Sequence, residues 1–321
     1  MTKTLKSKRS AVDHDVPNGK LSRCQITGST NLFEVIDLGH QPPCDSLLSK
    51  DMLDAPEKHY PLRLMHCPES GLSQLDYVID GSEIYYPDYH YRSGISKPLE
   101  IYQRAFADSI IAQFAIAPKS LCVDIGCNDG TLLTGFKRRD MEVVGVEPTN
   151  IAQIARKVNK IEAIQSFFTE SVARDIVADY GHAKVITMTN VFAHMAPLGE
   201  VMRGLSRLIA DDGIFVTESQ YLLDVLEKNQ FDGIYHEHIR TYSLKSSRQF
   251  PTPMAWETPQ YRAKRVSKSE TSLPRMYQPE STTRVNALMS SARCGAFIAP
   301  SRRKGSLWGG GEPLVDDLKV R

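Results

Sequence analysis

The sequence predicts an α/β protein built around a mostly parallel, doubly wound sheet. Apolar runs typical of strands alternate with helical patterns over residues 118–246, as in "SLCVDIG", "TLLTGFKRR", "MEVVGVEP" and "NIAQIARKVNK". Residues 21–80 before them hold short apolar runs broken by Pro and Gly, which favour short strands and turns. Residues 247–321 show neither the helical spacing of apolar residues nor the alternation of a strand. We therefore expect a Rossmann-like domain that follows a small β-rich module and precedes a largely unstructured tail.

The composition is that of a globular chain. The 321 residues are 41% apolar with a net charge of +1, which allows two or three domains with a sizeable core. No apolar run approaches the roughly 20 residues of a membrane span, and the start "MTKTLKSKRS" lacks a secretory apolar stretch. We expect a cytoplasmic protein that does not contact a membrane. The six scattered cysteines favour free thiols or a metal site over a disulfide framework.

Two segments precede the predicted sheet besides the module. Residues 1–20 are polar and basic, and we expect a disordered leader there. Residues 81–117 are expected to form a helical connector, because "SKPLEIYQRAFADSIIAQFAI" repeats apolar residues at helical spacing: Ile101, Phe106, Ile110 and Phe114.

The loop after the first predicted strand, "VDIGCNDG", has the composition of a ligand loop. Glycines let a ligand approach the backbone, and an acid at the end of the second strand can hold two ribose hydroxyls. Neither G-x-G-x-x-G nor a P-loop lysine is present, so a nucleoside is favoured over a dinucleotide or a triphosphate. A purely structural turn with a solvated Glu147 stays open as the alternative. The candidate cofactor residues are Asp124, Gly126, Asn128, Asp129, Gly130, Glu147 and Pro148.

The stretch "FDGIYHEHIRTYSLKS" gathers four polar or aromatic groups at residues 235–238. An extended loop would present either Tyr235 with Glu237 or His236 with His238 on one side. A histidine can take a proton near neutral pH, and a neighbouring carboxylate can orient it. The i, i+4 spacing of helical zinc ligands is absent. A polar loop at the domain rim remains the other interpretation.

The order of "DLGHQPP", "YPDYHYRSG", "DIGCNDGTLL", "GVEPT", "NVFAHM" and "FDGIYHEHIRTYSLKS" resembles the bacterial nucleotide-sugar C-methyltransferases, which methylate C3 of a dTDP-4-keto-deoxysugar. The resemblance implies a class I S-adenosylmethionine-dependent methyltransferase domain after a zinc-binding module. It implies that the loop and Glu147 hold S-adenosylmethionine. It also implies that His238 is the general base, in a sugar site lined by Tyr89, His194, Tyr235 and Glu237.

The implied chemistry fits these residue types. A carbon next to a ketone becomes nucleophilic when a base removes its proton and the enolate is stabilised. His238 would remove the proton, and Tyr235 or Tyr89 would hydrogen-bond the oxyanion. His194 would hold the sugar or share the oxyanion, and an ordinary structural histidine remains its alternative.

The zinc module departs from the family pattern of two C-x-x-C pairs. Here the pairs read Cys24-Gln-Ile-Thr27 and Cys67-Pro-Glu-Ser70, and hydroxyls are poor zinc ligands. His40, Cys44 or His66 could substitute, but no spacing demands it. We expect an incomplete metal site at Cys24 and Cys67, and zinc is doubtful.

The pattern ends abruptly after Ser246. Residues 245–321 hold fourteen Lys/Arg and six Asp/Glu, which leaves 25 basic and 32 acidic residues before them, so the charge changes sign. The second α/β domain implied by the resemblance is absent, and we expect out-of-frame translation to have replaced it. Two further interpretations stay open: a pseudoenzyme that binds the nucleoside without turnover, and nucleic-acid binding by the basic tail, which we do not expect.

Overall fold

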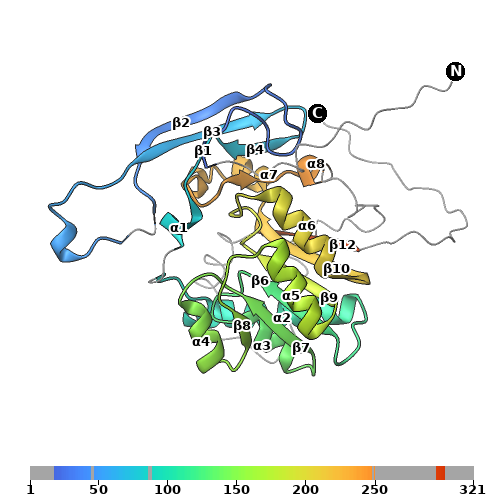
Figure 1. Cartoon of the computed structure of the whole chain (residues 1–321). Coiled ribbons are helices and arrows are strands. Elements are labelled where there is room, and N and C mark those ends of the chain that lie inside the picture. The colour runs from blue at the N-terminus through green and yellow to red at the C-terminus, as the bar shows by residue number, and fades with distance from the viewer. Residues whose placement is uncertain (1–17, 45–46, 86–88, 248, 250–293, 301–321) are drawn as a thin grey trace, which may run out of the picture.

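The computed structural model describes residues 18–44, 47–85, 89–247, 249 and 294–300 (Figure 1). The predicted leader lies outside these residues except for 18–20. Most of the predicted tail, and with it the expected frame change, lies outside them as well.

The central sheet has six strands in the order β12-β10-β9-β6-β7-β8. Five of them are parallel: β6 (Leu121–Ile125), β7 (Glu142–Val146), β8 (Glu162–Ile164), β9 (Ala183–Thr189) and β10 (Ile209–Gln220). The chain winds outward from β6 to β8, then returns to β9 on the other side of β6. This reversal creates a crevice at the carboxyl ends of β6 and β9, where such sheets bind ligands. The predicted doubly wound sheet is confirmed.

Helices cover both faces of this sheet because its strands are apolar on both sides. Val123 and Ile125 pack in the cluster that includes α5 (Glu170–Tyr180) and α6 (Leu198–Leu208). Cys122, on the opposite face, packs in a second cluster. This cluster includes residues of three other helices: α2 (Lys97–Gln113), α3 (Thr131–Lys137) and α4 (Ile151–Lys157). Short helices α7 (Leu222–Glu227) and α8 (Leu244–Ser247) follow the sheet.

The connector helix α2 forms as predicted, but its buried face differs. Ile101 is 60% exposed, whereas Ala107 and Ile110 are buried. The reason is the close approach of α3: a Cβ on Gly135 would lie 2.9 Å from the Ala107 Cβ. Small residues therefore form the contact between the two helices, and Ile101 lies outside it although it shares the helical spacing of the other apolar residues.

The β-rich module contains the antiparallel strands β2 (Phe33–Gln41), β3 (Tyr60–Cys67) and β4 (Leu72–Leu75). Its fourth strand, β11 (Arg240–Thr241), follows the parallel strands in the chain and pairs with β4. A separate pair joins β1 (Gly19–Lys20) to β5 (Tyr77–Val78), and α1 (Gly81–Ile84) follows. The module lies across the end of the domain near α7 and α8 (Figure 1).

One strand falls where the sequence showed no pattern. β12 (Cys294–Pro300) pairs antiparallel with β10, from Cys294 opposite Gln220 to Pro300 opposite Ile214. It completes the edge of the sheet, which explains why a short apolar run, "CGAFIAP", is found in an otherwise polar segment.

No helix among the described residues is long and apolar enough to cross a membrane.

Candidate active site

The loop after β6 is shaped by backbone conformations that favour glycine. Gly126 has φ +73°, and a Cβ at this position would clash with the Val191 side chain, which follows β9. Asn128 and Gly130 also have positive φ, at 52° and 78°. The loop therefore turns sharply at the carboxyl end of β6 and packs against the chain leaving β9, at the crevice of the sheet.

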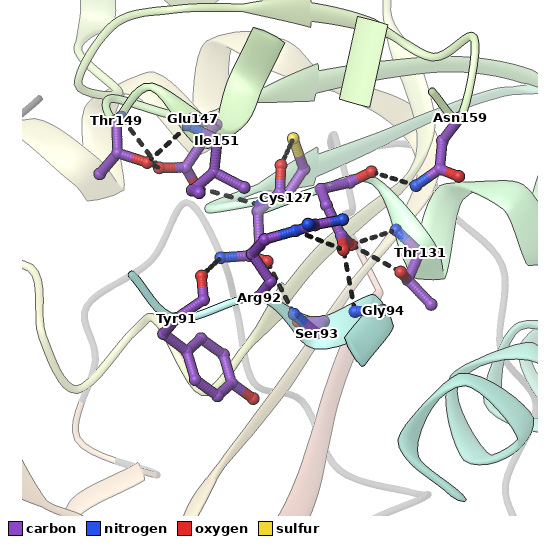
Figure 2. A network of polar contacts seen from close by, with 12 residues as sticks. Tyr91, Arg92, Ser93, Gly94, Cys127, Thr131, Glu147, Thr149, Ile151 and Asn159 are labelled. Atoms are coloured by element: carbon purple, nitrogen blue, oxygen red, sulfur yellow. Dashed lines mark hydrogen bonds and ion pairs between the residues drawn. The ribbon is translucent and has the colours of Figure 1, made fainter. Parts of the chain in front are cut away.

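Glu147, at the end of β7, is anchored by three hydrogen bonds (Figure 2). Its carboxylate accepts from the Asn128 amide at 3.0 Å, and from the amide and hydroxyl of Thr149 at 2.9 and 2.7 Å. The side chain is buried, with 5% exposure. A carboxylate offers about four lone-pair sites, so capacity remains to accept from a ribose hydroxyl. Pro148 lies between Glu147 and Thr149 in the same turn.

Asn128 and Asp129 use their side chains to hold the connector, whose residues 91–94 are labelled in Figure 2. Asn128 Oδ1 accepts from the Ser93 amide at 2.9 Å, and its Nδ2 donates to the Tyr91 carbonyl at 3.0 Å. Asp129 Oδ2 accepts from the Gly94 amide at 2.9 Å. These two predicted cofactor residues thus fix the segment at 91–94 against the loop.

Asp124 is a buried carboxyl inside β6. The Thr187 hydroxyl on neighbouring β9 donates to it at 2.6 Å. Burial raises the pKa of Asp124 to about 7; the Thr187 hydrogen bond opposes this rise and the nearby Glu147 charge adds to it. The Asp124 side chain therefore links the central strands β6 and β9 beneath the loop.

The cluster at residues 235–238 forms a turn, because the His238 amide donates to the Tyr235 carbonyl at 3.0 Å. The segment is therefore not extended, and neither pairing that an extended loop would present is found. The turn places the Tyr235 hydroxyl 2.8 Å from His238 Nε2. His236 faces the module instead, with Nε2 3.2 Å from the Tyr60 carbonyl.

His238 is held as a neutral imidazole with a defined tautomer. Its Nδ1 lies 2.9 Å from the Gly233 carbonyl, which can only accept, so Nδ1 carries the hydrogen and Nε2 the lone pair. Burial lowers the pKa of His238 to about 4, and the neighbouring His194 acts in the same direction. The Nε2 lone pair is therefore available at neutral pH.

The other predicted sugar-site residues gather around this histidine. The ring of His194 lies 4.8 Å from that of His238, centroid to centroid, and its Nδ1 lies 3.6 Å from the Glu237 carboxylate. Tyr85 reaches the same nitrogen at 2.9 Å through its hydroxyl, and its ring contacts Tyr89 at 5.9 Å. The structure thus brings all five predicted residues together.

The sequence interpretation missed several polar partners. Tyr85 belongs to the same tyrosine-rich stretch as Tyr89, so that composition was the available signal. Burial raises the pKa of Tyr85 well above its ordinary value, with a contribution from Glu237, and its hydroxyl stays protonated. Thr149 follows Glu147 by two residues, the spacing of a capping turn.

The two predicted metal residues, Cys24 and Cys67, lie buried in the module. The Cys24 thiol contacts the Ser70 hydroxyl at 3.2 Å, and the Thr27 hydroxyl contacts the Cys67 thiol at 3.9 Å. Within the described ranges, no group of three or more His, Cys, Asp or Glu side chains is placed to hold a metal ion.

Family comparisons agree with this architecture. Residues 99–250 match the family model described as "Methyltransferase domain". The chain carries a class I methyltransferase domain. Residues 24–85 match the model described as "Putative zinc binding domain", so the methyltransferase domain follows such a module, as predicted.

Individual proteins similar to this chain include C-methyltransferase NovU of Streptomyces niveus. It is 30% identical over 227 residues, which cover 70% of this chain and 54% of NovU, so the chain spans about half the length of that relative. Two solved structures are more distant. The plantazolicin methyltransferase BpumL with a monoazolic desmethylPZN analog and SAH is 14% identical, covering 66% of this chain and 87% of BpumL, with a TM-score of 0.42. A SAM-dependent methyltransferase from Anabaena variabilis is 17% identical, covering 48% and 71%, with a TM-score of 0.37.

Proposed function

We propose that this chain is an S-adenosylmethionine-dependent C-methyltransferase that acts at C3 of a nucleotide-linked 4-keto-deoxysugar. The similarity to NovU supports carbon methylation. The observation that carries the proposal is the turn that places the Tyr235 hydroxyl against the Nε2 lone pair of His238. Methyl transfer to oxygen or nitrogen needs no carbon acid to be deprotonated, whereas transfer to the carbon next to a ketone requires a base that removes its proton.

The residues at the carboxyl ends of β6 and β7 fit the cofactor. Glu147 has acceptor capacity left for one ribose hydroxyl, and the glycine-shaped loop lies beside it at the carboxyl end of β6. S-adenosylmethionine would supply an electrophilic methyl group there. Val191, which packs against Gly126, is three residues before His194, so the cofactor loop and the proposed sugar site share one edge of the sheet.

The proposed base step follows from the tautomer of His238. Nε2 takes the proton from sugar C3, the C3–H electron pair moves toward the C4 ketone oxygen, and the Gly233 carbonyl keeps the new imidazolium oriented through Nδ1. The Tyr235 hydroxyl, released from Nε2, turns to donate to the enolate oxygen. The Glu237 carboxylate, 3.6 Å from His194, stabilises positive charge in this pocket.

Exchange of the sugar C3 proton with deuterated solvent tests the proposal. His238→Asn keeps a donor for the Gly233 carbonyl and removes the base, so we expect exchange to fall by about 10²–10⁴-fold while S-adenosylmethionine binding persists. His236→Asn, in the same turn but facing the module, is the matched control and should retain exchange. Exchange at the wild-type rate in His238→Asn contradicts the assignment. Cofactor binding without exchange in the wild-type chain favours a nucleoside-binding protein without turnover.

A further inference from the structure

Two turns in the module have the same conformation. One runs from Cys24 to Gly28 and the other from Cys67 to Gly71, and each reads Cys-x-x-hydroxyl-Gly. In both, the glycine amide donates to the cysteine carbonyl at 2.8 Å. Both glycines adopt left-handed backbone, with φ of 71° and 72°. Each turn therefore presents its first and fourth side chains from one tight loop, the geometry by which paired ligands are offered to a zinc ion.

The two turns face each other through these four side chains. Cys24 contacts Ser70 at 3.2 Å and Thr27 contacts Cys67 at 3.9 Å, so each thiol meets a hydroxyl of the opposite turn. Cys24, Cys67 and Ser70 are almost fully buried. The arrangement is that of a four-ligand site in which one ligand of each pair is a hydroxyl.

This donor set does not fit zinc. Structural zinc sites use four thiolate or imidazole ligands, and neutral hydroxyls bind zinc poorly. Two of the three substitutes considered from the sequence have other partners: His66 Nδ1 lies 2.9 Å from the Ser73 hydroxyl, and the Cys44 thiol donates to Glu237 at 3.6 Å.

We propose that this site is a metal-free form of a zinc module, in which crossed thiol–hydroxyl hydrogen bonds join the two turns in place of a metal ion. Buried thiols and hydroxyls that hydrogen-bond to one another leave none of these polar groups without a partner. The backbone of each turn is fixed by its own glycine and its own hydrogen bond. The turns therefore keep the shape of a metal site, and the two hydroxyl positions decide whether a metal binds.

Metal content of the full-length chain tests this inference. After equilibration with zinc and dialysis, we expect the wild-type protein to hold substoichiometric zinc by plasma mass spectrometry, and a chelator to leave its melting temperature unchanged. The double variant Thr27→Cys with Ser70→Cys should hold one zinc per chain and show the thiolate-to-metal band when loaded with cobalt. Its melting temperature should fall when a chelator is added.

The metal content and melting temperature of the wild-type protein test the inference even if the double variant does not fold. One zinc per wild-type chain, or a chelator-dependent loss of its melting temperature, overturns the inference. A folded double variant that binds neither zinc nor cobalt also overturns it, because the turns would then lack the geometry of a metal site.

Discussion

The Nε2 atom of His238 begins the proposed reaction, and its surroundings determine the pH at which it works. Burial and the neighbouring His194 disfavour the imidazolium, while the Gly233 carbonyl and the Glu237 charge favour it. The net effect lowers the pKa from the ordinary 6.5 to about 4. The base is therefore deprotonated across the neutral range, and the imidazolium formed in the reaction is a strong acid that can return its proton.

We expect the exchange rate of the sugar C3 proton to be independent of pH between about 6 and 8. It should fall about tenfold per pH unit only below about 4, because a lowered pKa keeps the lone pair free until that point. The same shift stabilises the folded protein above pH 6.5, and this contribution is lost as pH falls toward 4. A pH–rate profile with its inflection at 6.5 or above would show that His238 is not the base or is solvated.

At this scale, the sequence predicts residue types better than it predicts their partners. Tyr235, Glu237 and His238 stood out as a cluster, but their pairing depended on a turn hydrogen bond that no periodicity signals. Extended geometry would have joined His236 to His238, whereas the turn joins His238 to Tyr235 and sends His236 to the module. Tyr85 was missed because its partner, His194, lies 109 residues away.

At the scale of elements, β11 joins the turn at residues 235–238, which carries the proposed base, to the β-rich module. Its Arg240 is fully buried and is enclosed by groups from three parts of the chain. The guanidinium donates to Gln25 in the module, to the Phe192 and Met195 carbonyls after β9, and to the Tyr242 hydroxyl at 2.9 Å. This side chain therefore fixes the turn relative to both the module and the domain.

Arg240→Met should lower the free energy of unfolding by about 3 kcal/mol, because it leaves buried acceptors without donors. The matched control is Arg139→Met, an exposed arginine paired with Asp108 on the surface, whose loss should cost about 1 kcal/mol or less. Urea unfolding of both variants provides the measurement. Equal losses would mean that Arg240 is not a structural link.

The sequence predicts the long elements because their apolar patterns are local. The alternation from "SLCVDIG" to "GIFVTES" gives β6 through β10 and the helices between them. β11 could not be predicted in this way: it is two residues long, and its partner strand β4 lies far earlier in the chain. The same is true of β12, whose pairing with β10 follows a long interval without pattern.

At the scale of the whole molecule, the proposed site is assembled from all three described parts. The connector supplies Tyr85 and Tyr89, and the domain supplies His194 and the turn at residues 235–238. The loop after β2 brings Cys44 to Glu237. Asn128 and Asp129 tie the connector to the loop after β6. A ligand that fixes the loop after β6 would therefore also fix the connector, which carries two tyrosines of the proposed sugar site.

The most direct test of the account is calorimetric titration of the full-length chain with S-adenosylmethionine. We expect one saturable site, binding that is weaker by about 1–3 kcal/mol in Glu147→Ala because a ribose hydroxyl loses its acceptor, and no change in Glu142→Ala, an exposed acid at the start of the same strand. Absence of binding, equal affinity in the Glu147→Ala variant, or tighter binding of NADH than of S-adenosylmethionine would contradict the account.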